Sequence, residues 1–179
     1  MSSAPRRATV SPPCVPISGT RLLAALAAMG LVVIGGAARA GTGLERLVGH
    51  WSCAGHFIAN GASIAGELAI EADLRTGAVI VRHDDLAPGA YHALEVWTPD
   101  KSGPGFRAAI SDRFSGMRWF EASGWSGDSL TWVRLEGGAT AEQFEYVLTG
   151  PDDMRVDWSV ARGGAMKLGD TLACRRAGP

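Results

Sequence analysis

The segment MRVDWSV, residues 154–160, decides the fold, because its apolar and polar side chains alternate strictly. Successive side chains of a β-strand point to opposite faces of the sheet, so this alternation predicts a strand with one buried and one solvated face. The same period of two recurs in residues 67–74 and 144–148. Only residues 42–48 suggest a short turn of helix, so the repeated pattern predicts an all-β chain.

Turn signals separate the alternating segments at intervals of roughly ten residues, a spacing typical of sandwiches and barrels. Asn60-Gly61 is the clearest of them, because both residues tolerate a positive φ. A meander of long apolar strands has exposed edges unless the sheet closes on itself. The sequence therefore predicts an antiparallel meander closed into a small barrel of about eight to ten strands. The expected strands are residues 49–58, 64–74, 78–83, 91–97, 105–111, 117–122, 129–135, 142–149, 154–162 and 166–174.

The start of the chain has the three parts of a secretory signal peptide. Arginines precede an uncharged run over residues 22–38, and Ala38-Arg39-Ala40 supplies small residues at the positions that a signal peptidase recognises. We therefore predict a signal peptide over residues 1–40 and a single domain over residues 41–179, exported to the periplasm or secreted. The alternative is a permanent membrane anchor, but the run is shorter than the roughly 20 apolar residues that span a bilayer.

The charge of the predicted domain limits its partners. Four basic residues lie in residues 1–40, which leaves 13 basic and 18 acidic residues in the domain, a net charge of −5. Nucleic-acid binding needs a concentrated basic face, and anionic lipid needs a basic patch. We therefore expect no nucleic-acid partner, and membrane contact only through the signal segment during export. The sequence predicts no particular oligomeric state.

Two cysteines, Cys53 and Cys174, remain in the domain once Cys14 leaves with the signal peptide. An even pair of cysteines in an oxidising compartment indicates a disulfide. The alternative is a pair of buried free thiols in the core.

Gly49-His50-Trp51, at the start of the first expected strand, resembles the Gly-x-Trp signature of lipocalins and the wider calycin group. In that family the Trp closes the floor of the barrel and an Arg after the last strand packs over it. The resemblance implies a floor formed by Trp51 and Arg175, or by the neighbouring Arg176. It also implies that the first and last strands are neighbours, so that a Cys53–Cys174 bond would join them. The uncharacterised bacterial envelope proteins that the chain resembles imply no known activity.

Tryptophans are the most prominent candidates for a binding site. Small-molecule sites are largely apolar with a few fixed polar groups, and an eight-stranded barrel has room for one small ligand. The alternative is that the rings simply fill the core. The residues predicted to line a ligand site are Trp97, Trp119, Trp132 and Trp158, with Glu95 as a polar group among them.

The cluster of side chains most able to support metal binding or catalysis consists of His83, Asp85 and His92. A hairpin with its loop near residues 85–90 would set His83 across from His92, and two histidines with a carboxylate could ligate zinc. The alternative is a solvated loop at the barrel mouth. Haem-binding barrels of related shape use a His late in the chain, whereas no His follows His92. We therefore predict no metal and no other cofactor.

Three functions remain open at this point. The leading hypothesis is an exported barrel that binds a small apolar or amphiphilic molecule without bond chemistry. The second is a ligand-free interaction or structural module of the envelope. The third is a metal-assisted enzyme at the mouth formed by His83, Asp85 and His92. No nucleophile motif, phosphate loop or dinucleotide fingerprint occurs, so no catalytic residue is predicted.

Overall fold

The structure is a computed structural model that describes residues 42–138 and 141–178, and the predicted signal peptide lies outside these ranges. No helix in the described part of the chain is long and apolar enough to cross a membrane. The only helix described there is a 3-10 turn within the segment where a helical turn was expected. The elements are η1 (Leu44–Leu47), β1 (Gly49–Phe57), β2 (Ser63–Asp73), β3 (Ala78–Asp85), β4 (His92–Pro99), β5 (Phe106–Asp112), β6 (Gly116–Ala122), β7 (Trp125–Ser126), β8 (Ser129–Arg134), β9 (Glu142–Leu148), β10 (Asp153–Arg162) and β11 (Ala165–Arg176).

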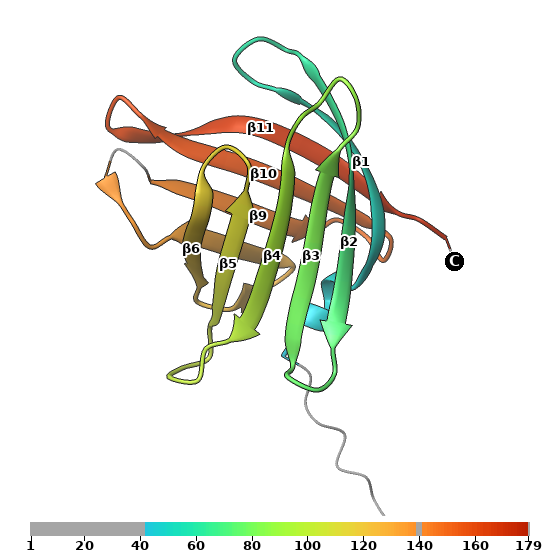
Figure 1. The fold of residues 1–179 in the computed structure, drawn as a ribbon, viewed down its shortest axis with the longest axis vertical. Coiled ribbons are helices and arrows are strands. Elements are labelled where there is room, and N and C mark those ends of the chain that lie inside the picture. The colour runs from blue at the N-terminus through green and yellow to red at the C-terminus, as the bar shows by residue number, and fades with distance from the viewer. Residues whose placement is uncertain (1–41, 139–140, 179) are drawn as a thin grey trace, which may run out of the picture. The chain divides into compact units, whose positions relative to one another are not determined.

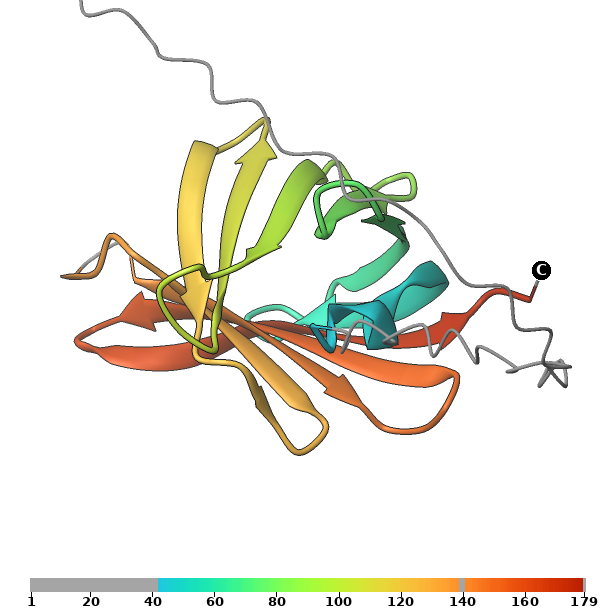
Figure 2. The ribbon, with the colours of Figure 1, turned by 90° about the horizontal axis from the view of Figure 1, so that it is seen from below.

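The strands form one antiparallel sheet that closes into a ten-stranded barrel, which confirms the predicted fold class (Figures 1 and 2). The order is β6-β5-β4-β3-β2-β1-β11-β10-β9-β8, and β8 pairs back with β6. This last pairing is short, with only Phe120 opposite Arg134 and Glu121 opposite Val133. The two-residue strand β7 pairs with β8 alone. Sequence analysis did not predict it, because two residues are too few to show a period.

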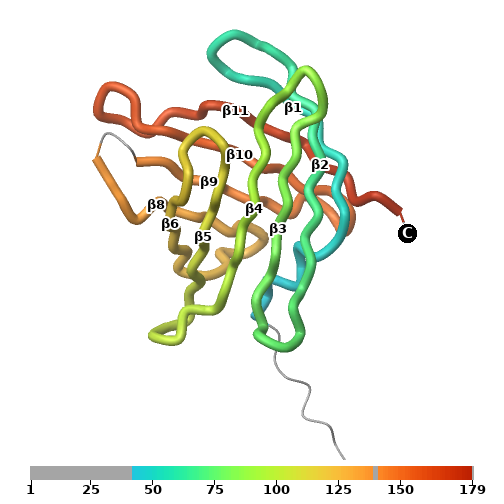
Figure 3. Tube along the Cα trace, viewed as in Figure 1, coloured from blue at the N-terminus to red at the C-terminus, as the bar shows by residue number. Residues whose placement is uncertain are grey.

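The trace in Figure 3 shows β9, β10 and β11 crossing behind β2 to β6, so the chain wraps around a common interior. The first and last strands meet along the barrel wall, as the resemblance implies. Cys53 lies directly opposite Cys174 in this pairing, and the two form a disulfide across 121 residues of sequence. Two residues further along β1, Gly55 permits close approach of the strands, because a Cβ there would lie 1.8 Å from the carbonyl oxygen of Thr171.

Trp51 is buried at the end of the barrel next to η1, here called the floor, and the arginine that packs over it is Arg176 and not Arg175. Arg176 is opposite Trp51 in the strand register, and its guanidinium carbon lies 4.1 Å from the centre of the indole ring. Arg175 is one residue earlier, so its side chain points to the outer face, where it is 79% exposed and pairs with Asp153. The indole N–H of Trp51 donates to the carbonyl oxygen of Leu47 at 2.9 Å, which ties the floor to η1.

An aromatic layer lies in the barrel interior. The ring of Trp97 lies 5.1 Å from that of Trp132 and 5.2 Å from that of Tyr146, while Phe106 lies 6.2 Å from Trp132. All four side chains are buried. Their contacts are in the range of aromatic pairs that stabilise a core beyond simple burial. These rings thus fill their part of the barrel interior.

Candidate functional site

A cavity of about 510 Å³ lies at the end of the barrel away from Trp51. Strand β1 runs from Trp51 at the floor to Phe57 at the cavity. Its antiparallel neighbours β2 and β11 reach the cavity with Ile64 and Asp170. A volume of this size is in the range of small-molecule sites in proteins, roughly 300–1,000 Å³.

Apolar side chains from several strands line one part of the cavity. Trp158 on β10 is fixed there from two directions. Its indole N–H donates to Glu142 at 3.1 Å, and its ring lies against the backbone of β11 at Gly169. A Cβ at position 169 would lie 2.4 Å from the ring, so this placement requires glycine. The apolar lining consists chiefly of Phe57, Ile64, Phe114, Phe144, Val156, Trp158 and Leu172.

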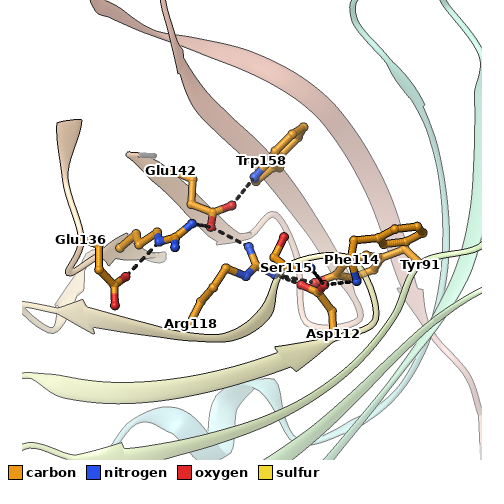
Figure 4. A network of polar contacts seen from close by, with 9 residues as sticks. Tyr91, Asp112, Phe114, Ser115, Arg118, Glu136, Glu142 and Trp158 are labelled. Carbon is orange, nitrogen blue, oxygen red and sulfur yellow. Dashed lines mark hydrogen bonds and ion pairs between the residues drawn. The ribbon is translucent and has the colours of Figure 1, made fainter. Parts of the chain in front are cut away.

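A buried ion network forms the polar part of the lining (Figure 4). The Arg118 guanidinium, on β6, donates through Nη1 to Glu142 at 2.6 Å and through Nη2 to Asp112 and to the Tyr91 hydroxyl. Its side chain is only 4% exposed. Buried charges are tolerated where each has partners, and here one guanidinium bridges carboxylates from two other strands. The network therefore fixes the positions of β5, β6 and β9 around the cavity.

Asp112 also organises the turn that follows β5. Its Oδ1 accepts the backbone N–H groups of Phe114 and Ser115 at 2.7 and 2.6 Å. The same carboxylate thus holds both Arg118 and the turn that carries Phe114 to the cavity rim. Figure 4 shows Asp112 together with Arg118, Phe114 and Ser115.

A second set of polar groups lines the cavity from β3 and β11. His83 Nε2 lies 3.8 Å from Asp85 Oδ1, which is too long for a hydrogen bond, and burial lowers the pKa of this imidazole. Asp170 lies next to Trp158 in the register of β10 and β11. Burial, and then the charges of Asp85 and Asp157, raise the pKa of Asp170 to about 7.

Glu95 belongs to the aromatic layer below the cavity. It is 3% exposed and accepts the indole N–H of Trp97 at 2.8 Å. Burial raises the pKa of Glu95 to about 7, against the opposing effect of that hydrogen bond. A carboxyl group in this position holds a proton at the pH where exposed carboxyls have lost theirs.

The predicted ligand residues lie in three different places: the cavity, the aromatic layer and the outer face of the barrel. Trp158 lines the cavity. Trp97 and Trp132 are fully packed in the aromatic layer with Glu95, and none of the three is among the residues that line the cavity. Trp119 is 51% exposed on the outer face of β6, where its neighbours Arg118 and Phe120 point inward. Ligand contact by these five residues stays a prediction, which the position of Trp158 in the cavity lining favours for that residue alone.

The proposed zinc cluster does not assemble. His83 is opposite Ala93 in the β3–β4 register, while His92 is opposite Asp84. This one-residue difference puts His92 on the outer face, where it contacts Asp84 at 2.8 Å, and leaves His83 with Asp85 inside. No group of three or more potential metal ligands occurs among residues 42–138 and 141–178.

The ion network and Asp170 were not predicted as site residues, although the sequence carries a signal for them. Each charged residue continues the inward phase of its strand: Arg118 precedes Phe120 by two residues, and Asp170 precedes Leu172 by two. Asp112 and Glu142 follow the same rule on β5 and β9. A charge in phase with the buried side chains of its strand is therefore the pattern that identifies this site.

Comparisons with known proteins show the fold and no more. No protein-family model matches the chain, and no curated protein matches it. A solved structure, described as "Crystal Structure of Rv2717c from M. tuberculosis", superposes with a TM-score of 0.61 at 13% identity. The match covers 78% of this chain and 98% of that chain. The two chains therefore share a closed antiparallel barrel fold.

Proposed function

We propose that this chain is an exported, lipocalin-like barrel that binds a small amphiphilic molecule in the cavity above the aromatic layer, without bond chemistry. The observation that carries the proposal is a cavity of about 510 Å³ with aromatic walls and fixed polar groups at one end. An apolar wall provides affinity by burial, while a few oriented polar groups provide specificity. The stacked pair of Trp51 and Arg176 supports the lipocalin-like assignment.

The rigidity of the site favours binding. Arg118 is held by Asp112 and Glu142, and Glu142 also holds Trp158, so the walls are connected to one another before any ligand enters. A preorganised site loses less conformational entropy on binding. The disulfide and the pattern of residues 1–40 support export.

Two other functions receive less support. A ligand-free module would have a filled interior, whereas the end of this barrel away from Trp51 has space for a small molecule. A metal-assisted enzyme would need His83 and His92 on one face, whereas the hairpin register puts them on opposite faces. Binding is therefore the function that the cavity supports best.

The test is a fluorescence titration with N-phenyl-1-naphthylamine, a neutral apolar probe whose emission rises in an apolar site. The full chain is produced with its own N-terminal segment in cells with an oxidising compartment, and native mass spectrometry first checks for a co-purified ligand. We expect saturable binding that is weakened at least several-fold by Trp158→Ala. Trp119→Ala, which removes an exposed tryptophan from the outer face, is the matched control and should bind as the wild type does.

Absence of saturable binding in the wild-type protein, together with a mass that shows no co-purified molecule, would contradict the proposal. Equal binding by wild-type protein and a folded Trp158→Ala variant would place the probe outside this cavity and would also count against it.

A further inference from the structure

The charges around the cavity do not balance. The lining contains four carboxyl groups but only one guanidinium, that of Arg118. Arg118 pairs with Asp112 and Glu142, which account for two of the four. In the described part of the chain, Asp85 and Asp170 contact no arginine or lysine. Two carboxyl groups therefore face the cavity without a cation.

The same side of the cavity contains a buried polar atom without a partner. His83 Nε2 has no hydrogen bond within the described residues, although buried polar atoms are normally paired. Burial keeps this imidazole neutral, and in the Nδ1-protonated tautomer its Nε2 is an acceptor. With Asp85 and Asp170 it gives three acceptors that line one cavity.

We infer that the cavity recognises a primary organic amine, whose ammonium group binds at Asp85, Asp170 and His83 and whose apolar part lies against Trp158. An ammonium group has three N–H donors, which matches the three acceptors on this side. Aromatic faces attract cations as well as apolar groups, so Trp158 suits both parts of such a molecule. This inference rests on the proposed function, because it names the chemical class of the ligand that the cavity binds.

An acidic ligand fits the same cavity poorly. Both Nη atoms of Arg118 already donate to Glu142, Asp112 and Tyr91, and its Nε, which has no partner among the described residues, is buried. A carboxylate ligand would have to displace one of these acids and would also face Asp85 and Asp170. Like charges brought together in a partly desolvated site repel strongly, so the cavity should select against anions.

The test compares three probes of nearly the same size and shape that differ in charge: 4-phenylbutylamine, 4-phenylbutan-1-ol and 4-phenylbutanoate. Each is titrated at pH 8 against the complex with N-phenyl-1-naphthylamine, and its affinity is obtained by displacement. We expect the amine to bind roughly tenfold more tightly than the alcohol, as a charge-assisted hydrogen bond would give, and the carboxylate to bind most weakly.

Variants then locate the ammonium group. Asp85→Asn and Asp170→Asn should each weaken the amine about tenfold, the size of one charge-assisted contact, and should affect the alcohol and the naphthylamine much less than the amine. Asp84→Asn is the matched control, because it removes the same charge from the adjacent residue on the outer face. Far-ultraviolet circular dichroism checks that all three variants are folded.

The outcomes separate this inference from the proposed function. If the naphthylamine binds but the amine binds no better than the alcohol, the barrel binds small molecules and the inference is wrong. Equal loss of amine binding in Asp84→Asn and the two cavity variants would also overturn it, since a general effect of net charge would then suffice. If neither the naphthylamine nor any of the three probes binds, the proposed function itself fails.

Discussion

The guanidinium of Arg176 lies over the indole ring of Trp51, with 4.1 Å between its carbon and the ring centre. These residues are far apart in the sequence, on the first and last strands, but they are direct cross-strand partners. Arg176 also donates to the carbonyl oxygens of Val48 and Arg46, so it satisfies backbone groups between η1 and β1. The pair therefore joins the first and last strands, β1 and β11, at the floor of the barrel.

Replacement of Arg176 should destabilise the barrel. We expect Arg176→Ala to lower the free energy of unfolding by about 1–3 kcal/mol, from the lost cation–π contact and the lost hydrogen bonds to backbone carbonyls. Arg175→Ala is the control, because that side chain is exposed and should contribute less than about 1 kcal/mol. Urea denaturation at neutral pH measures both. Equal losses in the two variants would contradict the assignment of Arg176 to the floor.

The ion network should be more sensitive than any surface ion pair. Arg118→Met leaves Asp112 buried without a cation and leaves Glu142 with Arg134 alone, so we expect a loss of about 3–5 kcal/mol in the free energy of unfolding. Arg107→Met on the neighbouring strand β5 also breaks two ion pairs, but these are exposed, and the loss should be below about 1 kcal/mol. Denaturation by urea distinguishes the two. Similar losses would mean that the network is not buried as described.

Most of the fold could be predicted because its signals are local. The alternation of residues 154–160 and the turn at Asn60-Gly61 need no knowledge of partner strands, and the strands formed where these patterns placed them. The errors arose where one residue matters. Shifting a strand pairing by one residue exchanges the two faces, and this is why Arg176 lies over Trp51 whereas its neighbour Arg175 does not. The same shift separates His83 from His92.

The site was less predictable because it depends on several registers at once. Arg118 meets Asp112 across one hairpin, but it meets Glu142 only because the barrel closes between β6 and β8. That closure involves two residue pairs, which leave no local mark in the sequence. The tryptophans were predicted because they are large and apolar. The charged residues whose positions alternate in phase with the buried side chains carried the information about the site.

Buried Glu95 should make stability depend on pH. Its pKa is raised from about 4.5 to about 7 in the folded protein, so the folded state binds a proton more tightly than the unfolded state. Stability from this group is therefore complete below about pH 4.5 and is lost as the pH rises towards 7 and above. A shift of this size corresponds to about 3 kcal/mol.

The variant Glu95→Gln isolates this effect, because glutamine keeps an acceptor for the indole N–H of Trp97. We expect wild-type protein and Glu95→Gln to have similar free energies of unfolding at pH 5, and the variant to be more stable by up to about 3 kcal/mol at pH 8. Glu67→Gln, on the outer face of β2, should show no such divergence. A constant difference between Glu95→Gln and wild type across this pH range would contradict the prediction.

Asp170 should make amine binding depend on pH in the opposite sense. In the empty cavity, burial and the charges of Asp85 and Asp157 raise the pKa of Asp170 to about 7. His83 also faces this side, and burial lowers its pKa, which favours the neutral imidazole. A bound ammonium group favours the ionised carboxylate, so binding below pH 7 must first remove a proton from Asp170. The affinity for 4-phenylbutylamine should therefore fall as the pH is lowered from 8 to 6, by at most about tenfold per pH unit.

The measurement is the displacement titration repeated at pH 8, 7 and 6. The probe itself stays charged throughout, because an alkylamine has a pKa near that of lysine, about 10.4. The alcohol 4-phenylbutan-1-ol carries no charge, so its affinity should be constant and should report any general change in the cavity. Asp170→Asn should bind the amine weakly and with little dependence on pH. A wild-type affinity for the amine that is the same at pH 8 and pH 6 would contradict an ammonium site at an Asp170 whose pKa is about 7.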